Sequence, residues 1–235
     1  MLLGIDTSGA VSVALAEGTL DDPATPPRVI ARRADERARH HDEVLLALVE
    51  AVMDDAGARR DQLTGIVVGR GPGPFTGLRV GLVVGRTIAA VLGVPLVGVC
   101  SLDALALQAL AEAEEPAAVG TVAVALDARR REVYHARYAR TADGGLERTA
   151  GPAVDAPAAV AAELSAADLL AGSGAALYPE LLPASAAPVH ADAGHLILAA
   201  HAAAARGEDL TDTAPLYLRE PDAAKPTAPK SALGR

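Results

Sequence analysis

Residues Gly69 to Gly93, G-R-G-P-G-P-F-T-G-L-R-V-G-L-V-V-G-R-T-I-A-A-V-L-G, decide the fold of this 235-residue chain. They follow a β-branched run, Ile66 to Val68, that predicts a short buried strand. Thr76 is expected to cap the helix that comes next, and Gly93 with Pro95 to end it. The pattern therefore indicates a strand, a loop rich in glycine and proline, and an apolar helix.

Glycine repeats every four residues within this helix, at Gly77, Gly81 and Gly85, and so forms one stripe along it. An interior helical glycine costs roughly 0.5–1 kcal/mol relative to alanine, so tight packing on the stripe is expected to offset that loss. A stripe without side chains lets another backbone approach closely. Two interpretations stay open, because the stripe can dock a partner helix or seat this helix on the chain's own sheet.

The chain begins with a predicted hairpin, with strands at 2–5 and 11–15 and the tip Asp6-Thr7-Ser8-Gly9 between them. A third strand is expected at 29–34. Asp6 ends a buried strand beside two hydroxyl groups, an arrangement that can hold a hydrated cation or face a phosphate. The alternative is an Asx turn, in which the carboxylate caps its own backbone.

A helix is predicted from Asp42 to Ala56. One helical face carries Leu45, Leu48, Val49 and Val52. The apolar surface extends further around the cylinder through Val44, Leu46 and Met53. Such a helix is normally covered from more than one side, either within its own domain or by a partner.

The rest of the chain divides into lobes. Residues 1–103 form the predicted N-terminal lobe, in which a strand at 96–99 and the start of a helix near Ser101 follow the apolar helix. Residues 104–192 form the second lobe. Its predicted elements are strands at 119–126, 133–139 and 168–171 and helices at 158–164 and 175–182. A helix at 193–205 and an extended segment ending at 219 are expected to pack back on the body, and 220–235 to be a disordered tail.

Asp127 ends the strand at 119–126 as Asp6 ends the first strand, and the turn after it carries three arginines, Arg129 to Arg131. These arginines can contact a phosphate or an acidic partner. They can also be the solvated turn of a chain that uses arginine in preference to lysine.

Composition excludes several classes of protein. The net charge is −9 and only 2% of residues are aromatic. Both values argue against unaided RNA binding, because phosphate contacts need basic side chains and base stacking needs aromatic ones. Cys100 is the single cysteine, so no internal disulfide forms. The amino terminus lacks the pattern of a signal peptide, and the apolar region 80–100 is interrupted by Arg86 and by Gly93 to Pro95, so we expect no membrane span and a cytoplasmic protein.

Four blocks of the sequence carry a resemblance to a known family: G-I-D-T-S at 4–8, G-R-G-P-G-P-F-T-G-L-R-V-G at 69–81, L-D-A-R-R-R-E-V-Y at 126–134 and P-L-Y-L-R at 215–219. In this order they resemble the TsaB (YeaZ) family over almost the whole chain. The resemblance implies an α/β fold of two actin-like lobes (RNase H-like, ASKHA), with mixed sheets flanked by helices.

The resemblance also implies a role. Members of the family are noncatalytic dimerisation subunits that bind a catalytic TsaD-type paralogue and a TsaE-type ATPase, and the complex threonylcarbamoylates adenosine 37 of ANN-decoding tRNAs. It implies a homodimer when the chain is alone, tRNA contact only through the complex, and no intrinsic cofactor. The partner ATPase uses the ATP, and the paralogue holds the metal through two histidines four residues apart. No two of the six histidines here have that spacing.

In this family the two helices of the first lobe form the pairing surface, which implies the interface candidates Val44, Leu45, Leu48, Val52, Gly77, Gly81 and Gly85. Asp6, Thr7, Ser8 and Asp127 are the candidates for a vestigial nucleotide cleft. The competing hypothesis is an ASKHA-type nucleotide-binding phosphotransferase or ATPase that uses this cleft.

Overall fold

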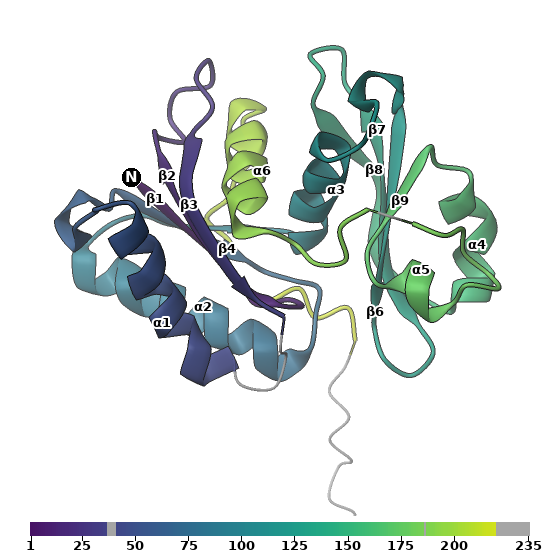
Figure 1. Cartoon of the computed structure of the whole chain (residues 1–235), viewed down its shortest axis with the longest axis horizontal. Helices are drawn as coiled ribbons and strands as arrows, with labels where there is room; N and C mark the ends of the chain where they lie inside the picture. Colours follow the sequence, from purple (N-terminus) through teal and green to yellow (C-terminus); the bar gives the residue numbers. More distant parts are fainter. Residues whose placement is uncertain (37–40, 186, 220–235) are drawn as a thin grey trace, which may run out of the picture.

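Two mixed β-sheets form the centres of two lobes in the computed structural model, which describes residues 1–36, 41–185 and 187–219 (Figure 1). The first sheet has the strand order β3-β2-β1-β4-β5 and the second β8-β7-β6-β9. The strands of the first sheet are β1 (Leu2–Asp6), β2 (Val11–Glu17), β3 (Arg28–Asp35), β4 (Gly65–Gly69) and β5 (Leu96–Val99). Those of the second are β6 (Thr121–Asp127), β7 (Val133–Arg140), β8 (Leu146–Asp155) and β9 (Leu169–Ala171).

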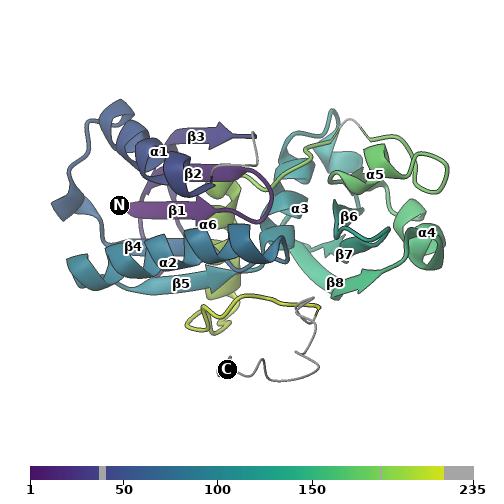
Figure 2. The same ribbon diagram turned by 90° about the horizontal axis from the view of Figure 1, so that it is seen from below.

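Helices cover both faces of the first sheet. On one face lie α1 (His41–Asp55) and α2 (Phe75–Leu92), with the short turn η1 (Arg60–Gln62) between them, and on the other lies α6 (Ala193–Ala205) (Figure 2). The central strands β1 and β4 run parallel, with Leu3 opposite Ile66, and are buried along their whole length. Such strands carry unbroken apolar runs because neither face meets water.

The second sheet is covered by α3 (Ser101–Ala111) on one face and by α4 (Pro157–Ser165) and α5 (Gly174–Leu177) on the other (Figure 1). The turn η2 (Pro116–Ala118) leads into β6. Although α6 belongs to the first sheet, it packs against α3, and the core around these two helices is shared between the lobes.

The glycine stripe of α2 faces the chain's own sheet. A Cβ atom on Gly81 would lie 2.5 Å from Thr7 Oγ1, and one on Gly85 would lie 2.4 Å from Val68 Cγ1. Gly77, Gly81 and Gly85 are all buried. The expectation that Gly81 and Gly85 dock a partner is therefore wrong, because Thr7 and Val68 already fill the space beside them. Gly77 lies on the same stripe, and its carbonyl accepts a hydrogen bond from Thr7.

Most predicted elements agree with the structure, and three details differ. The helix predicted at 175–182 is only the short helix α5, which ends at Leu177. Pro74, not Thr76, occupies the cap position of α2, and the helix ends at Gly93 in the left-handed conformation, φ 68°. Strand β8 was not predicted. It lies at the edge of its sheet and contains Pro152, which removes a backbone donor that only an edge position tolerates.

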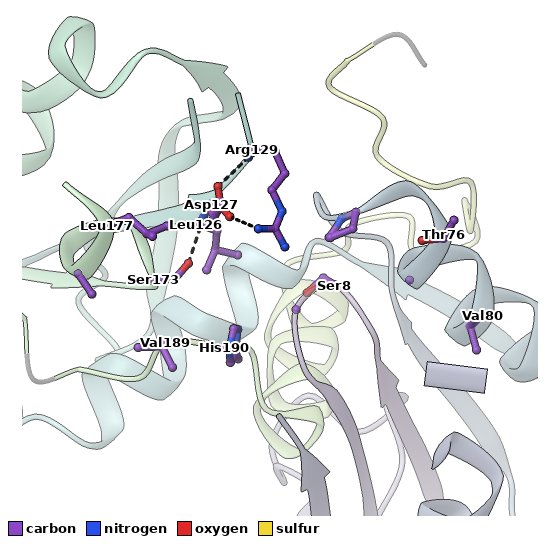
Figure 3. Close-up of a pocket in the computed structure, with 14 residues that line it drawn as sticks. Ser8, Thr76, Val80, Leu126, Asp127, Arg129, Ser173, Leu177, Val189 and His190 are labelled. Atoms are coloured by element: carbon purple, nitrogen blue, oxygen red, sulfur yellow. Dashed lines mark hydrogen bonds and ion pairs between the residues drawn. The ribbon is translucent and has the colours of Figure 1, made fainter. Parts of the chain in front are cut away.

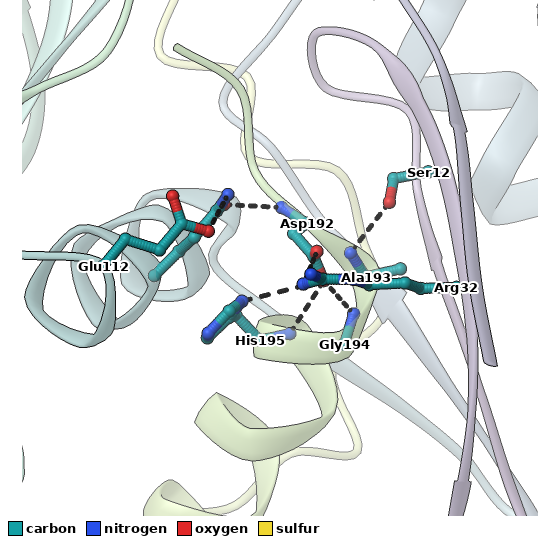
Figure 4. A network of polar contacts seen from close by, with 8 residues as sticks. Ser12, Arg32, Glu112, Asp192, Ala193, Gly194 and His195 are labelled. Atoms are coloured by element: carbon teal, nitrogen blue, oxygen red, sulfur yellow. Dashed lines mark hydrogen bonds and ion pairs between the residues drawn. The ribbon is translucent and has the colours of Figure 1, made fainter. Parts of the chain in front are cut away.

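A polar network fixes the amino terminus of α6 between the strands and α3 (Figure 4). Asp192 caps the helix by accepting from the backbone of His195 at 3.1 Å and forms an ion pair with Arg32 at 3.1 Å. Ala193 donates its backbone N–H to Ser12 Oγ at 2.9 Å.

The segment after α6 runs as a strap across the edge of the first lobe to the second. Gly98 of β5 donates to the carbonyl of Leu210 at 2.9 Å, and Leu216 donates to the carbonyl of Arg70 at 2.8 Å. Arg219, at the end of the strap, donates to the carbonyl of Ala128 in the second lobe at 2.9 Å.

The packing of α2 predicts that Gly85→Ala destabilises the fold. Its new methyl group would overlap Val68, so we expect the free energy of unfolding to fall by about 1–3 kcal/mol in urea denaturation, despite alanine's higher helix propensity. Val91→Ala, on the exposed face of the same helix, is expected to change it by less than about 0.5 kcal/mol. Equal stability of Gly85→Ala and the wild type would contradict this packing.

Candidate functional site

Asp6 is sealed inside the first lobe. Its side chain is 1% exposed and accepts three hydrogen bonds, from Ser8 N at 2.9 Å, Ser8 Oγ at 2.6 Å and Ser101 Oγ at 2.5 Å. Burial raises the pKa of the Asp6 carboxyl and outweighs these three hydrogen bonds, which act in the opposite direction. The bonds from Ser8 form the Asx-type turn that was the alternative to a cation or phosphate site.

Thr7 joins strand β1 to helix α2. Its hydroxyl donates to the carbonyl of Gly77 at 2.8 Å and accepts from the N–H of Gly81 at 3.2 Å. The side chain is 1% exposed. It therefore positions the helix and does not face a ligand.

A cavity of about 780 Å³ opens between the two lobes (Figure 3). One wall is formed by the hairpin tip and the start of α2, and the other by the end of β6, helix α5 and the segment before α6. Its walls are mostly apolar, with polar groups from Ser8, Thr76, Asp127, Arg129, Ser173 and His190.

Only two of the four predicted cleft residues line this cavity. Ser8 and Asp127 do, whereas Asp6 and Thr7 are enclosed behind the hairpin tip. The carboxylate of Asp127 forms an ion pair with Arg129 at 3.1 Å, and its backbone N–H donates to Ser173 Oγ at 3.1 Å. The structure thus does not bring two free carboxylates together at the cavity, and the expected grouping of Asp6 and Thr7 with Asp127 is corrected.

A second candidate site is the outer surface of α1 and α2, which pack against each other (Figure 2). Of the predicted interface residues, Leu45 and Val52 are fully buried against the sheet, and Val44 and Leu48 are half-buried. The exposed apolar side chains are different ones: Leu46 (55% exposed), Val83 (61%) and Val91 (78%).

Helical spacing contains the signal for these missed residues. Val83 lies on the face of α2 opposite Gly81 and Gly85, and Val91, eight residues further along, lies at one side of that face. Once the glycines are assigned to the sheet, the outward valines follow. We call the surface formed by Leu46, Val83 and Val91 the helical face.

The described part of the chain offers neither a metal cluster nor a helix that is free of the fold. Within it, no three His, Cys, Asp or Glu side chains gather as a metal site. Helix α2 is long and apolar enough to cross a membrane by composition, but Gly81 and Gly85 seat it on the first sheet and Arg79 and Arg86 interrupt its outer surface.

Comparison with known proteins follows this geometry. A family model described as TsaD: tRNA N6-adenosine threonylcarbamoyltransferase matches residues 30–229. The solved structure of YeaZ from Pseudomonas aeruginosa is 32% identical and has a TM-score of 0.74, with 92% of this chain and 99% of that chain covered. The chain belongs to the TsaB (YeaZ) family.

Two further proteins are similar to the chain. An uncharacterised protein of Mycobacterium tuberculosis is 41% identical over 202 residues, 85% of this chain and 84% of that protein. The tRNA threonylcarbamoyladenosine biosynthesis protein TsaB of Escherichia coli is 32% identical over 106 residues, 45% of this chain and 44% of that protein. The TsaB (YeaZ) resemblance and the two-lobed, actin-like α/β fold are both confirmed.

The buried acid predicts a pH-dependent effect of Asp6→Asn. Because folding raises the pKa of Asp6, this group stabilises the fold below the ordinary carboxyl pKa of about 4, and that contribution is lost as the pH rises through the raised value. Asparagine does not ionise. The unfolding free energy of Asp6→Asn relative to wild type should therefore increase as the pH rises above about 4, by about 1.4 kcal/mol for each unit by which folding raises the pKa of Asp6. Urea denaturation at several pH values measures this difference, and a difference that stays the same at every pH would refute the raised pKa of Asp6.

Proposed function

We propose that this chain is a noncatalytic subunit of the machinery that makes threonylcarbamoyladenosine in tRNA. In this proposal it binds a TsaD-type catalytic paralogue, and a TsaE-type ATPase joins the complex. The support is membership of the TsaB (YeaZ) family together with a surface suited to a partner, the helical face.

The helical face carries the proposal because its apolar side chains have no partner within the described chain that covers them. Single exposed apolar residues are common, but Leu46, Val83 and Val91 lie on two helices that contact each other. Burial of such side chains in an interface removes apolar surface from water at about 25 cal/mol per Å².

The charges on helices α1 and α2 favour self-association of the chain when the catalytic paralogue is absent. Glu50 and Asp54 are exposed on α1, whereas Arg79 and Arg86 are exposed on α2. In a two-fold dimer each surface meets its own copy, so the acidic helix of one subunit can lie beside the basic helix of the other. We include a homodimer of the isolated chain in the proposal.

We propose that this subunit has no catalytic activity of its own because of the way in which Asp6 is enclosed. Both of its oxygens accept hydrogen bonds from within the lobe, and the side chain does not reach the cavity between the lobes. We therefore assign the metal to the catalytic paralogue and ATP hydrolysis to the partner ATPase. We likewise propose that tRNA is bound in the complex and that the complex acts in the cytoplasm.

The experiment is copurification of this chain with the TsaD-type protein of the same organism, followed by a threonylcarbamoylation assay on tRNA with and without this chain. We expect a stable complex and modification that depends on the chain. Modification at the full rate without it would overturn the proposed role.

Val83→Glu tests which surface binds. A carboxylate placed in an apolar interface loses its hydration without gaining a partner, so we expect binding to the paralogue to weaken at least tenfold. Leu181→Glu, at an exposed leucine of the second lobe, is the matched control and is expected to bind like the wild type. Thermal melts confirm that both variants fold. If Val83→Glu also binds like the wild type, the helical face is not the docking surface.

A further inference from the structure

The turn between β6 and β7 has an unusual backbone. Arg129, Arg130 and Arg131 have φ angles of 60°, 54° and 62°, and at every other positive φ angle in the described chain the residue is glycine. The left-handed conformation is unfavourable for a residue with a Cβ atom, and glycine would avoid that cost. Strain of this kind persists typically at functional sites. We call these three residues the arginine turn.

Neighbouring groups hold the arginine turn in place. The backbone N–H of Ala128 donates to the carbonyl of Glu132 at 3.0 Å, which closes the loop, and Arg129 N donates to Asp127 Oδ1 at 2.7 Å. Arg219 of the strap donates to the carbonyl of Ala128 at 2.9 Å. The three arginine side chains are exposed while their backbone is fixed.

A stack of planar groups lies on the first lobe near the arginine turn. The rings of Phe75 and Tyr217 have centroids 4.7 Å apart and an interplanar angle of 26°, and the Arg79 guanidinium lies 3.7 Å from the Phe75 centroid. Both rings are 37% exposed. In a chain with one phenylalanine and four tyrosines, two aromatic residues thus meet at the surface. We call Phe75, Arg79 and Tyr217 the aromatic stack.

The strap joins these two features into one surface. Tyr217 of the stack lies two residues before Arg219, which binds the base of the arginine turn. Arg129 of the turn and Thr76, next to Phe75, line the same cavity (Figure 3). In Figure 1 the turn lies at the lower edge of the second lobe, level with the near end of α2.

This surface is basic in a chain whose net charge is −9. Its described residues include five arginines and two carboxylates, with Asp127 beside Arg129 and Glu132 beside Arg219. A positive patch on an acidic protein attracts a polyanion to one place and repels it elsewhere.

We propose that the arginine turn and the aromatic stack form a contact surface for RNA, with phosphates on the arginines and an unstacked base on the exposed rings. The proposal rests on the proposed function, which supplies tRNA as the substrate of the complex. Guanidinium groups pair with phosphate oxygens, and aromatic and guanidinium planes stack on bases in single-stranded loops. An acidic protein segment would need the arginines but would leave the stacked rings unused, so RNA fits the whole surface better.

The test uses two pairs of adjacent arginines. Arg130→Gln with Arg131→Gln removes two charges from the arginine turn, and Arg59→Gln with Arg60→Gln removes the same charge from an exposed pair far from it in the sequence, in the first lobe. Each variant is combined with the TsaD-type paralogue and titrated with a fluorescent, in-vitro-transcribed ANN-decoding tRNA between about 50 and 200 mM salt. Gel filtration first confirms that the complexes form.

Loss of the turn arginines is expected to weaken tRNA binding roughly fivefold and to reduce the slope of log affinity against log salt by about one to two. The Arg59 and Arg60 variant should bind within about twofold of the wild type. Tyr217→Leu, which removes a stacking ring, should weaken binding roughly tenfold with little change in the salt slope. Equal affinity and slope for all complexes would overturn the proposal.

Two further outcomes are decisive. If a fluorescent polyglutamate peptide binds the wild-type complex and loses affinity with the turn variant, while tRNA binding is unchanged, the surface serves an acidic protein and the RNA proposal fails. If the wild-type chain does not bind the paralogue, the proposed function fails instead. The same titration with the full chain alone at about 50 mM salt then decides whether the arginine turn binds RNA.

Discussion

The hydroxyl of Thr7 lies where a side chain on Gly81 would be, and it hydrogen-bonds to the backbone of both Gly77 and Gly81. A threonine can donate and accept at once, so one side chain satisfies a carbonyl and an N–H of α2 at the end of β1. This contact fixes the rotation of α2 about its own axis. With the glycines turned inward, Val83 must face outward, Val91 is exposed beside it on the helix, and the start of the helix lines the cavity between the lobes.

The same close approach explains the state of Asp6. Its neighbour Thr7 hydrogen-bonds helix α2 to the hairpin, and Ser101, at the start of α3, donates a hydrogen bond to the carboxylate of Asp6. A Cβ atom on Gly69 would lie 1.9 Å from Asp6 Oδ2, so even the adjacent strand leaves no room around the acid. An acid so enclosed stabilises a turn and does not meet a ligand. The noncatalytic role that we propose is consistent with this packing.

Sequence patterns predicted the helices and strands that are specified by residues close together in the chain. The alanine-rich helix at Ala193–Ala205 follows from helical periodicity, and the end of α2 follows from Gly93. The direction of the glycine stripe did not follow, because spacing shows that a backbone approaches closely but not which one. Strand β8 was missed because Pro152 argues against a strand wherever the neighbours in the sheet are unknown. Asp6 and Asp127 were grouped by analogy between lobes, and only the three-dimensional path shows that one is buried and the other lines the cavity.

Helix α2 connects the two surfaces that we propose to be functional. Its outer residues Val83 and Val91 belong to the helical face, and its first residues Phe75 and Arg79 belong to the aromatic stack. A partner seated on the helical face would therefore lie next to RNA held at the stack and the arginine turn. Because the strap ties the stack to the second lobe through Arg219, a change in the angle between the lobes would move the arginine turn relative to that partner. In the proposed complex, such a connection would let a subunit without chemistry of its own affect how a substrate lies on its catalytic neighbour, since placement errors of about 1 Å already slow enzymatic reactions strongly.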